Sequence, residues 1–157
     1  MDNVYLKKSK IGRGIFAKKD IKKGELLGIF KGKIIPDTEE ALEKYGDYLL
    51  PVNYEEAMLV GNIFKYTNHS CDPNCGVKGG IKIIALRDIK NDEEVTIDYD
   101  TLEYDWEMDC KCESPKCRKK VRGYKHLSKD LKKKYKGFIA PYLLKKPVRK
   151  ELEWYYK

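Results

Sequence analysis

The sequence contains no long hydrophobic run. Its longest apolar-leaning stretch, residues 138–144, is far shorter than the roughly 20 residues that a transmembrane helix needs. Near the N-terminus it also lacks the basic, apolar and small-residue order of a signal peptide. We therefore expect a soluble, intracellular protein that does not enter a membrane. The length of 157 residues fits one domain with a hydrophobic core of its own.

The number of cysteines is odd. The chain has five cysteines, so they cannot all be paired within one chain. An intracellular compartment also keeps thiols reduced, which argues against a framework held together by disulfide bonds. We therefore expect these cysteines to act as metal ligands or as free thiols.

Acidic residues are nearly absent from one part of the chain. Residues 118–150 contain 14 Lys or Arg residues and one acidic residue, Asp130, whereas residues 1–117 contain 18 basic and 22 acidic residues. The net charge of +8 therefore averages an acidic body and a basic C-terminal segment. Such a segment is either a solvated helix face or a surface that contacts nucleic acid or another acidic partner.

Short strands and small helices are predicted throughout. Runs of β-branched residues predict strands at 25–33, 81–87 and 94–99, with a hairpin turn at 78–80. The body is therefore expected to be mostly β.

Two short helices are expected beside these strands. The first, at 37–45, follows a proline, is expected to be capped by Asp37 together with Glu40, and ends before a glycine. The second, at 128–136, lies in the basic segment and is also followed by a glycine. Both would be small additions to the β structure.

Two segments of the sequence resemble each other. They are AKKDIKKGE at 17–25 and ALRDIKNDE at 85–93. Two copies are too few to build a solenoid. We interpret them as one strand-turn-strand arrangement used twice, which concerns the architecture and not the chemistry.

Three cysteines lie close together in the motif CKCESPKC at 110–117. A structural zinc site needs four ligands in a tetrahedron, so these three thiols need one more from elsewhere. Cys71 and Cys75 are the candidates, and the residues alone do not decide between them. The spacing favours zinc over free thiols.

Three other segments are ambiguous when each is taken singly. The run NHSCDPN at 68–74 has the composition of an Asx-rich turn. The sequence GRG at 12–14 lets a backbone pass close to a ligand, but it also suits an ordinary turn. Tyr99 ends a predicted strand, where a tyrosine is ordinarily half-buried.

The order and spacing of these segments together resemble the SET domain of protein lysine methyltransferases. The resemblance covers about residues 4–118, and residues 131–144 are also similar to the tail of short prokaryotic SET proteins. The matching motifs are GRGIFA at 12–17, GNIFKYTNHSCDPN at 61–74, EEVTIDY at 93–99 and the three-cysteine cluster.

The resemblance implies a particular fold and domain organisation. It implies a mostly β protein with small helices: the SET-domain β-clip fold with a C-terminal pseudoknot, a post-SET zinc clip and a short helical basic tail. The implied units are a SET domain at 1–105, a post-SET zinc-binding segment at 106–120 and a basic helical extension at 121–157.

The resemblance also implies the activity and its residues. The expected activity is methylation of a protein lysine with S-adenosylmethionine as donor, and Tyr99 is the expected catalytic residue. The implied cofactor contacts are Arg13, Gly14, Tyr48, Asn68, His69, Tyr99 and Lys111. The implied substrate channel is formed by Phe30, Tyr45, Ile97 and Tyr99. One structural zinc ion would be held by Cys71, Cys110, Cys112 and Cys117, which leaves Cys75 free.

Some positions depart from the family pattern. The family usually has an aromatic residue two positions before the catalytic tyrosine, and Ile97 stands there in this chain. The extra space predicts that more than one methyl group is added. Phe30 replaces a channel tyrosine. Arg118 followed by Lys119 replaces a common Arg-Gly pair, which is expected to alter how the last turn meets the adenine.

Two other functions are compatible with parts of the sequence. One is a catalytically inactive, zinc-stabilised module that binds nucleic acid or protein, although this predicts a degraded cofactor loop or a missing tyrosine. The other is a methyltransferase for a small molecule or a residue other than lysine. The acidic body suits a basic, lysine-containing protein or peptide substrate. The basic segment would then direct the enzyme to a nucleic-acid assembly in the cytoplasm or nucleus.

Overall fold

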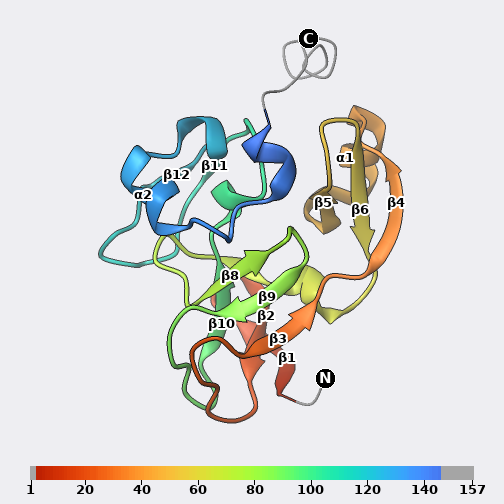
Figure 1. The fold of residues 1–157 in the computed structure, drawn as a ribbon. Helices are drawn as coiled ribbons and strands as arrows, with labels where there is room; N and C mark the ends of the chain where they lie inside the picture. The colour runs from red at the N-terminus through yellow and green to blue at the C-terminus, as the bar shows by residue number, and fades with distance from the viewer. Residues whose placement is uncertain (1–2, 146–157) are drawn as a thin grey trace.

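The computed structural model describes residues 3–145; residues 1–2 and 146–157, including the end of the predicted basic extension, lie outside the described part. Within it, twelve short strands form three sheets and a two-stranded ribbon, and two α-helices accompany them (Figure 1). The prediction of a mostly β fold with small helices is confirmed. None of the described helices is long and apolar enough to cross a membrane.

The first sheet joins segments from the two ends of the predicted SET region. Its order is β1-β2-β10-β7, formed by β1 (Val4–Ser9), β2 (Gly12–Ala17), β10 (Glu94–Ile97) and β7 (Asn68–His69). β10 runs antiparallel to β2 and parallel to β7. The segment that begins with Asn68 therefore lies directly beside the last strand of the SET region, as expected for the pseudoknot.

The second sheet has the order β3-β9-β8, with β3 at Leu26–Ile29, β9 at Lys82–Ala85 and β8 at Cys75–Lys78. The turn between β8 and β9 has two glycines with positive φ, 62° at Gly79 and 76° at Gly80. The hairpin predicted at this place is therefore confirmed, and the strand predicted at 81–87 is shorter than expected.

The third sheet carries the first helix. Its order is β4-β6-β5, with β4 at Gly32–Pro36, β6 at Glu56–Val60 and β5 at Leu49–Pro51. The predicted strand at 25–33 was wrong as a single element, because the chain leaves the second sheet after Ile29 and enters this one at Gly32. A Cβ at Gly32 would clash with the backbone carbonyl of Leu59 on β6, so this crossing requires glycine.

Helix α1 spans Glu39–Tyr45. It begins two residues later than predicted and ends at the predicted residue. Its N-cap is Thr38, whose side chain accepts a hydrogen bond from the Ala41 N–H at 3.1 Å. The predicted cap, Asp37, instead donates its N–H to the Glu55 carbonyl and extends the β4–β6 pairing. The cap was therefore assigned one residue too early, because both residues have side chains that suit an N-cap.

The two similar segments pair with each other. Each connects two strands, β2 with β3 and β9 with β10. Ile21 and Ile89, at the same position of each segment, exchange two backbone hydrogen bonds of 2.8 Å. Both side chains are almost fully buried, so the repeat closes one side of the core.

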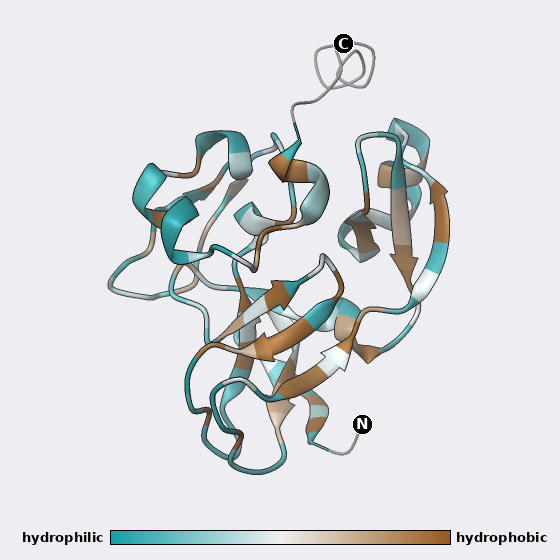
Figure 2. Ribbon diagram, viewed as in Figure 1, coloured by the Kyte–Doolittle hydropathy of each residue, from teal (hydrophilic) through white to brown (hydrophobic). Residues whose placement is uncertain are grey.

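The C-terminal part of the described chain is built onto this core. It contains the ribbon of β11 (Met108–Asp109) and β12 (Lys120–Val121) and helix α2 (Lys129–Lys134). Ser128 caps α2 rather than beginning it, so the predicted helix 128–136 is too long at both ends. Tyr135 and the residues after it pack into the main core, where apolar segments are brown in Figure 2.

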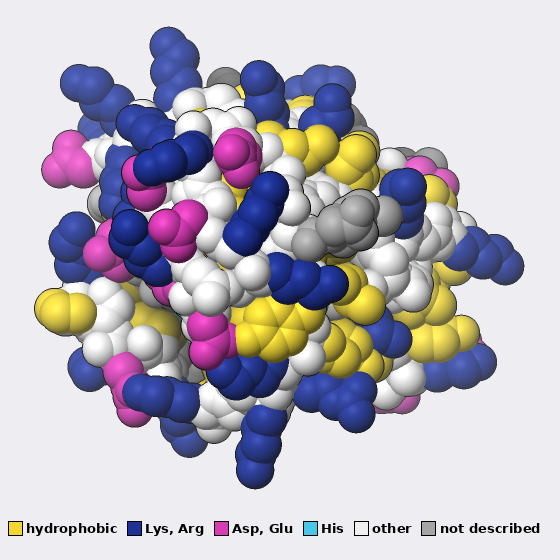
Figure 3. Space-filling model, turned by 90° about the horizontal axis from the view of Figure 1, so that it is seen from below, with side chains coloured by type: hydrophobic (Ala, Val, Ile, Leu, Met, Phe, Trp, Pro, Cys, Tyr) yellow, Lys and Arg dark blue, Asp and Glu magenta, His cyan; other side chains and the backbone are white. Residues whose placement is uncertain are grey.

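Among residues 3–145, basic side chains of the C-terminal segment lie beside acidic ones. Several of them pair with acidic residues of the body: Lys120 with Glu107 at 2.7 Å and Lys125 with Asp105 at 3.0 Å. Seen from below, Lys and Arg side chains project from all parts of the face, with acidic side chains among them (Figure 3). The charge asymmetry of the sequence is therefore partly neutralised by folding.

Candidate active site

Tyr99 lies in a turn at the end of the first sheet. The strand predicted to reach it ends at Ile97, because the Asp98 side chain accepts a hydrogen bond from the Asp100 N–H and begins a 3₁₀ turn at Tyr99–Thr101. The Tyr99 hydroxyl donates a hydrogen bond to the Thr67 carbonyl at 2.7 Å. Burial, and next the nearby Asp47 carboxylate, raise the pKa of Tyr99. The hydroxyl is therefore neutral at ordinary pH.

A cavity of about 360 Å³ adjoins Tyr99. It lies between the lobe formed by α1 and the third sheet and the segment that follows Tyr99. Phe30, Ile97 and Tyr99, three of the four predicted channel residues, line it together with Trp106. Of the described residues that line the cavity, none is Tyr45, whose ring lies 5.2 Å from the Lys44 ammonium.

The Asn68 side chain fastens three strands together. Its amide donates hydrogen bonds to the Arg13 carbonyl on β2 at 2.9 Å and to Glu94 Oε1 on β10 at 2.7 Å. A Cβ at Gly14 would clash with the same Glu94 carboxylate. The predicted residues Arg13, Gly14 and Asn68 are thus neighbours, and the Asn68 amide has a structural task at their junction.

His69 links the Tyr99 turn to a cysteine. Its Nδ1 accepts a hydrogen bond from the Tyr99 N–H at 3.1 Å, and its Nε2 lies 3.3 Å from Cys71 Sγ. The centroids of the His69 and Tyr99 rings are 5.2 Å apart. Burial, and next the positive charge of Arg118, lower the pKa of His69 to about 4. A neutral ring with fixed partners holds the backbone of Tyr99 in place.

Aromatic and cationic side chains stack beside the Arg13 strand. The Arg13 guanidinium lies 5.6 Å from the Tyr66 ring, which meets the Tyr48 ring edge to face at 5.8 Å. The Lys65 ammonium lies 4.7 Å from the Tyr48 ring. Arg13 and Tyr48 therefore meet through Tyr66, whereas the predicted cofactor contact Lys111 is exposed beside the cysteine cluster.

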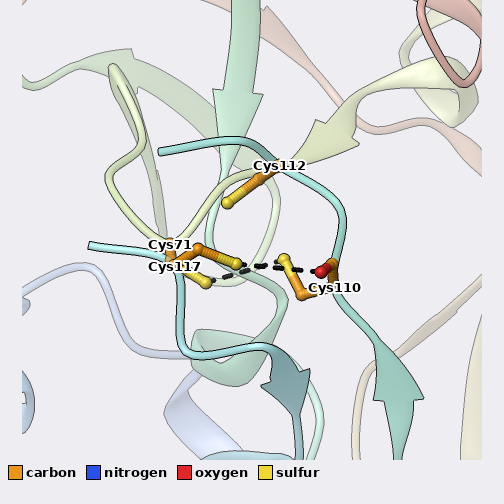
Figure 4. Close-up of side chains that lie close together, drawn as sticks. All are labelled: Cys71, Cys110, Cys112 and Cys117. Carbon is orange, nitrogen blue, oxygen red and sulfur yellow. Dashed lines mark hydrogen bonds between the residues drawn. The ribbon is translucent and has the colours of Figure 1, made fainter. Parts of the chain in front are cut away.

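Four cysteines converge beneath the Tyr99 turn. The sulfur atoms of Cys71, Cys110, Cys112 and Cys117 all lie within 4.8 Å of one another (Figure 4). Zinc with four Zn–S bonds of about 2.3 Å places sulfur atoms about 3.8 Å apart, and the distance between Cys71 Sγ and Cys110 Sγ is 3.7 Å.

The surroundings of these sulfur atoms also suit zinc. Burial raises the pKa of Cys71 to about 11, so a cation is needed to hold its thiolate. Backbone N–H groups of Arg118 and Lys119 point at Cys71 and Cys117. The fifth cysteine, Cys75, is fully buried on β8 in the main core. The cluster is therefore compatible with a zinc clip of the predicted composition.

The comparison with protein families agrees with this arrangement. A family model described as "SET domain" matches residues 12–100, which include β2, the Asn68 strand and Tyr99. The chain belongs to the SET-domain family.

The relatives that this chain matches are longer than the chain itself. The chain is 35% identical over 125 residues to histone-lysine N-methyltransferase trithorax of Drosophila virilis. This match covers 69% of the chain and 3% of that protein. It is also 34% identical over 130 residues to histone-lysine N-methyltransferase ASHH3 of Arabidopsis thaliana. That match covers 71% of the chain and 36% of the relative. The chain thus spans a small part of these relatives.

A solved structure has a similar fold. It is the humanized mutant of the Chaetomium thermophilum Polycomb Repressive Complex 2 bound to the inhibitor GSK126. The match has a TM-score of 0.53 and 30% sequence identity, and it covers 61% of this chain and 14% of that chain. The likeness supports the SET-like architecture described above.

Sequence reasoning missed the ion pairs that join the four-cysteine cluster of this SET domain to the Tyr99 turn. Arg118 binds both Asp98 oxygens at 2.8 and 2.9 Å and the Asp100 carboxylate at 2.7 Å. The other Asp100 oxygen accepts hydrogen bonds from the N–H groups of Arg122 and Gly123. The two acidic residues that flank Tyr99 were a signal, because buried carboxylates need a cation.

Acidic residues of the cavity were also missed. Asp37 and Glu103 line it, together with Asp47 and Asp105. Burial, and next the charge of Asp37, raise the pKa of Glu103 to about 8. Nothing in the sequence brings Asp37 near Glu103, because the two lie in different motifs far apart in the chain.

Proposed function

We propose that this SET domain is an S-adenosylmethionine-dependent protein-lysine N-methyltransferase with Tyr99 at the reacting centre. The observation that carries the proposal is the Tyr99 hydroxyl at a cavity with apolar walls, including Phe30 and Ile97. Relatives named histone-lysine N-methyltransferases match the same part of the chain. The activity is therefore assigned to the site formed by these residues.

The reaction needs an uncharged lysine. The side chain has an ordinary pKa of about 10.4, so its deprotonation at pH 7 costs about 5 kcal/mol. The apolar part of the cavity wall, which includes Phe30 and Ile97, disfavours the ammonium and lowers this cost. The amine nitrogen then forms a bond to the methyl carbon while the carbon–sulfur bond of the donor breaks. Tyr99 orients the amine, and correct positioning supplies much of the acceleration.

The donor supplies an electrophilic methyl group. We assign its contacts to Arg13, Gly14, Asn68 and His69 around the β2–β7 junction, and further to Tyr48, Tyr99 and Lys111. Ile97 lines the cavity where relatives of the family have an aromatic residue, and its smaller side chain leaves room for a methylated amine. We therefore propose successive addition of more than one methyl group.

The zinc clip has a structural role in this proposal. Four thiolates complete the tetrahedral shell of zinc and leave no position for substrate. We propose that residues 1–105 form the SET unit, that residues 106–120 form the clip and that residues 121–157 extend it. The substrate is a basic protein, with a nuclear, chromatin-associated role as one expected setting, and the basic extension is proposed to contact nucleic acid or another acidic partner.

A methylation assay tests this function. The purified protein is incubated with radiolabelled S-adenosylmethionine and a fraction of basic cellular proteins, beside a Tyr99→Phe variant. We expect labelled protein bands with the wild type and an at least roughly 100-fold lower rate with the variant. Calorimetry with S-adenosylmethionine serves as the control. Absence of both label and cofactor binding would favour the inactive binding module.

A further inference from the structure

The cavity beside Tyr99 has an acidic side that methyl transfer does not use. Asp37 and Glu103 line it, together with Glu39, Asp47 and Asp105. A lysine that reacts must lose its proton, and a carboxylate beside its amine would instead hold the proton in place. These acidic groups are therefore suited to a different positive charge from that of the target lysine.

Glu103 has no compensating partner among residues 3–145, where no hydrogen bond or salt bridge reaches its carboxylate. Asp105, by contrast, is paired with Lys125 and His126, each at 3.0 Å. The cavity partly buries the Glu103 side chain, and burial raises its pKa to about 8, so the carboxyl holds its proton at neutral pH. A cation in the cavity would favour the ionised carboxylate and pair with it.

The backbones that carry the two carboxylates are fixed on different walls. The Asp37 N–H donates to the Glu55 carbonyl at the end of the β4–β6 pairing. The Glu103 N–H donates to the Tyr99 carbonyl at 3.1 Å, and its own carbonyl accepts from the Tyr124 N–H at 2.7 Å. The two walls thus place two carboxyl groups where an entering cation favours their ionised forms.

Asp37 and Glu103 act on each other, because the charge of Asp37 is, after burial, a cause of the raised pKa of Glu103. Trp106 lines the same cavity. Its aromatic face favours a guanidinium, which also matches carboxylates through two parallel hydrogen bonds.

We propose that Asp37 and Glu103 form a subsite for an arginine side chain of the substrate, so that the preferred substrate segment carries arginine close to the target lysine. This inference rests on the proposed function, because it takes the cavity as the place where the peptide binds. It assigns sequence preference to two residues outside the motifs that carry the family resemblance.

Peptide binding tests the subsite without relying on catalysis. Each peptide has one lysine and one arginine in a neutral sequence, and the arginine is moved one position at a time. Matched peptides carry citrulline, which has the shape of arginine but no charge. Binding to the full chain is measured by fluorescence anisotropy with S-adenosylhomocysteine present. We expect one arginine position to bind about tenfold more tightly than its citrulline match.

Two variants and one control identify the residues. Glu103→Gln and Asp37→Asn should each bring the arginine-to-citrulline affinity ratio close to one. Glu43→Gln removes an exposed carboxylate of α1 that does not line the cavity, and it should keep the wild-type ratio. Circular dichroism checks that every variant is folded.

The outcomes separate this inference from the proposed function. A ratio that stays at the wild-type value in both Glu103→Gln and Asp37→Asn would overturn the subsite, as would the lack of any preferred arginine position. Methyl transfer to the same peptides is measured in parallel. Arginine-dependent binding without any methyl transfer would contradict the proposed function alone, and methyl transfer without arginine preference would contradict the subsite alone.

Discussion

At the scale of single residues, Glu103 links the cavity to the stability of the fold. Its ordinary pKa of 4.5 is raised to about 8 by burial and then by Asp37. Between these pH values the folded protein keeps a proton that the unfolded chain has already released. Raising the pH from 4.5 to 8 therefore favours unfolding, and the stability that the protonated carboxyl contributes is progressively lost.

Replacing Glu103 by glutamine should remove this pH dependence. We expect Glu103→Gln to be more stable than the wild type at pH 8 by on the order of 2 kcal/mol, with a smaller difference at pH 5. Urea denaturation at both pH values measures the difference. Glu43→Gln is the matched control and should follow the wild type. A difference that is the same at pH 5 and pH 8 would show that Glu103 ionises normally.

Arg118 is the residue whose loss should cost the most stability. It is the cation that faces the almost fully buried carboxylates of Asp98 and Asp100. Arg118→Gln leaves these two charges without their partner, and we expect a loss of about 3 kcal/mol in the free energy of unfolding. Arg118→Lys keeps the charge and should lose less. A loss below about 1 kcal/mol in Arg118→Gln would contradict this account of the ion pairs.

At the scale of elements, the four-cysteine cluster joins the segment after β7 to the segment between β11 and β12. Cys71 comes from the first, and Cys110, Cys112 and Cys117 come from the second. The Arg118 ion pairs continue this connection to the Tyr99 turn. The cysteine cluster and the Arg118 ion pairs therefore connect the two sides of the turn.

Metal analysis tests the assignment of the four ligands. We expect one zinc ion per chain in the wild type and in Cys75→Ala, because Cys75 lies in the main core. Cys112→Ser should retain much less zinc and should be cleaved faster by protease within residues 106–120. The control variant, Cys75→Ala, separates loss of a metal ligand from general loss of stability. Equal zinc content in all three proteins would exclude this site.

The elements differed in how well the sequence predicted them. The β8–β9 hairpin was correctly predicted because two adjacent glycines determine its turn locally. The strand at 25–33 was wrong because its division depends on the contact of Gly32 with Leu59 of another strand. The end of β10 was missed because a side chain, that of Asp98, begins the next turn.

At the scale of the whole molecule, the sequence predicted the SET-like architecture from the order of its motifs. Cys71 could be chosen over Cys75 only through the family resemblance, and the structure brings its sulfur to the cluster. The pairs Asp98–Arg118 and Asp37–Glu103 were not predictable, because they join residues that only the folded chain brings together. Part of the predicted charge asymmetry is also balanced within the described fold, by pairs such as Lys120 with Glu107.

The central claim is lysine methylation at the cavity beside Tyr99. The most direct measurement is amino-acid analysis of a substrate protein labelled with radioactive S-adenosylmethionine by the wild type and by Tyr99→Phe. We predict that the label elutes as methylated lysine, including forms with more than one methyl group, and that Tyr99→Phe gives almost none. Label in methylarginine or in a base-labile ester, or equal labelling by the two proteins, would contradict the claim.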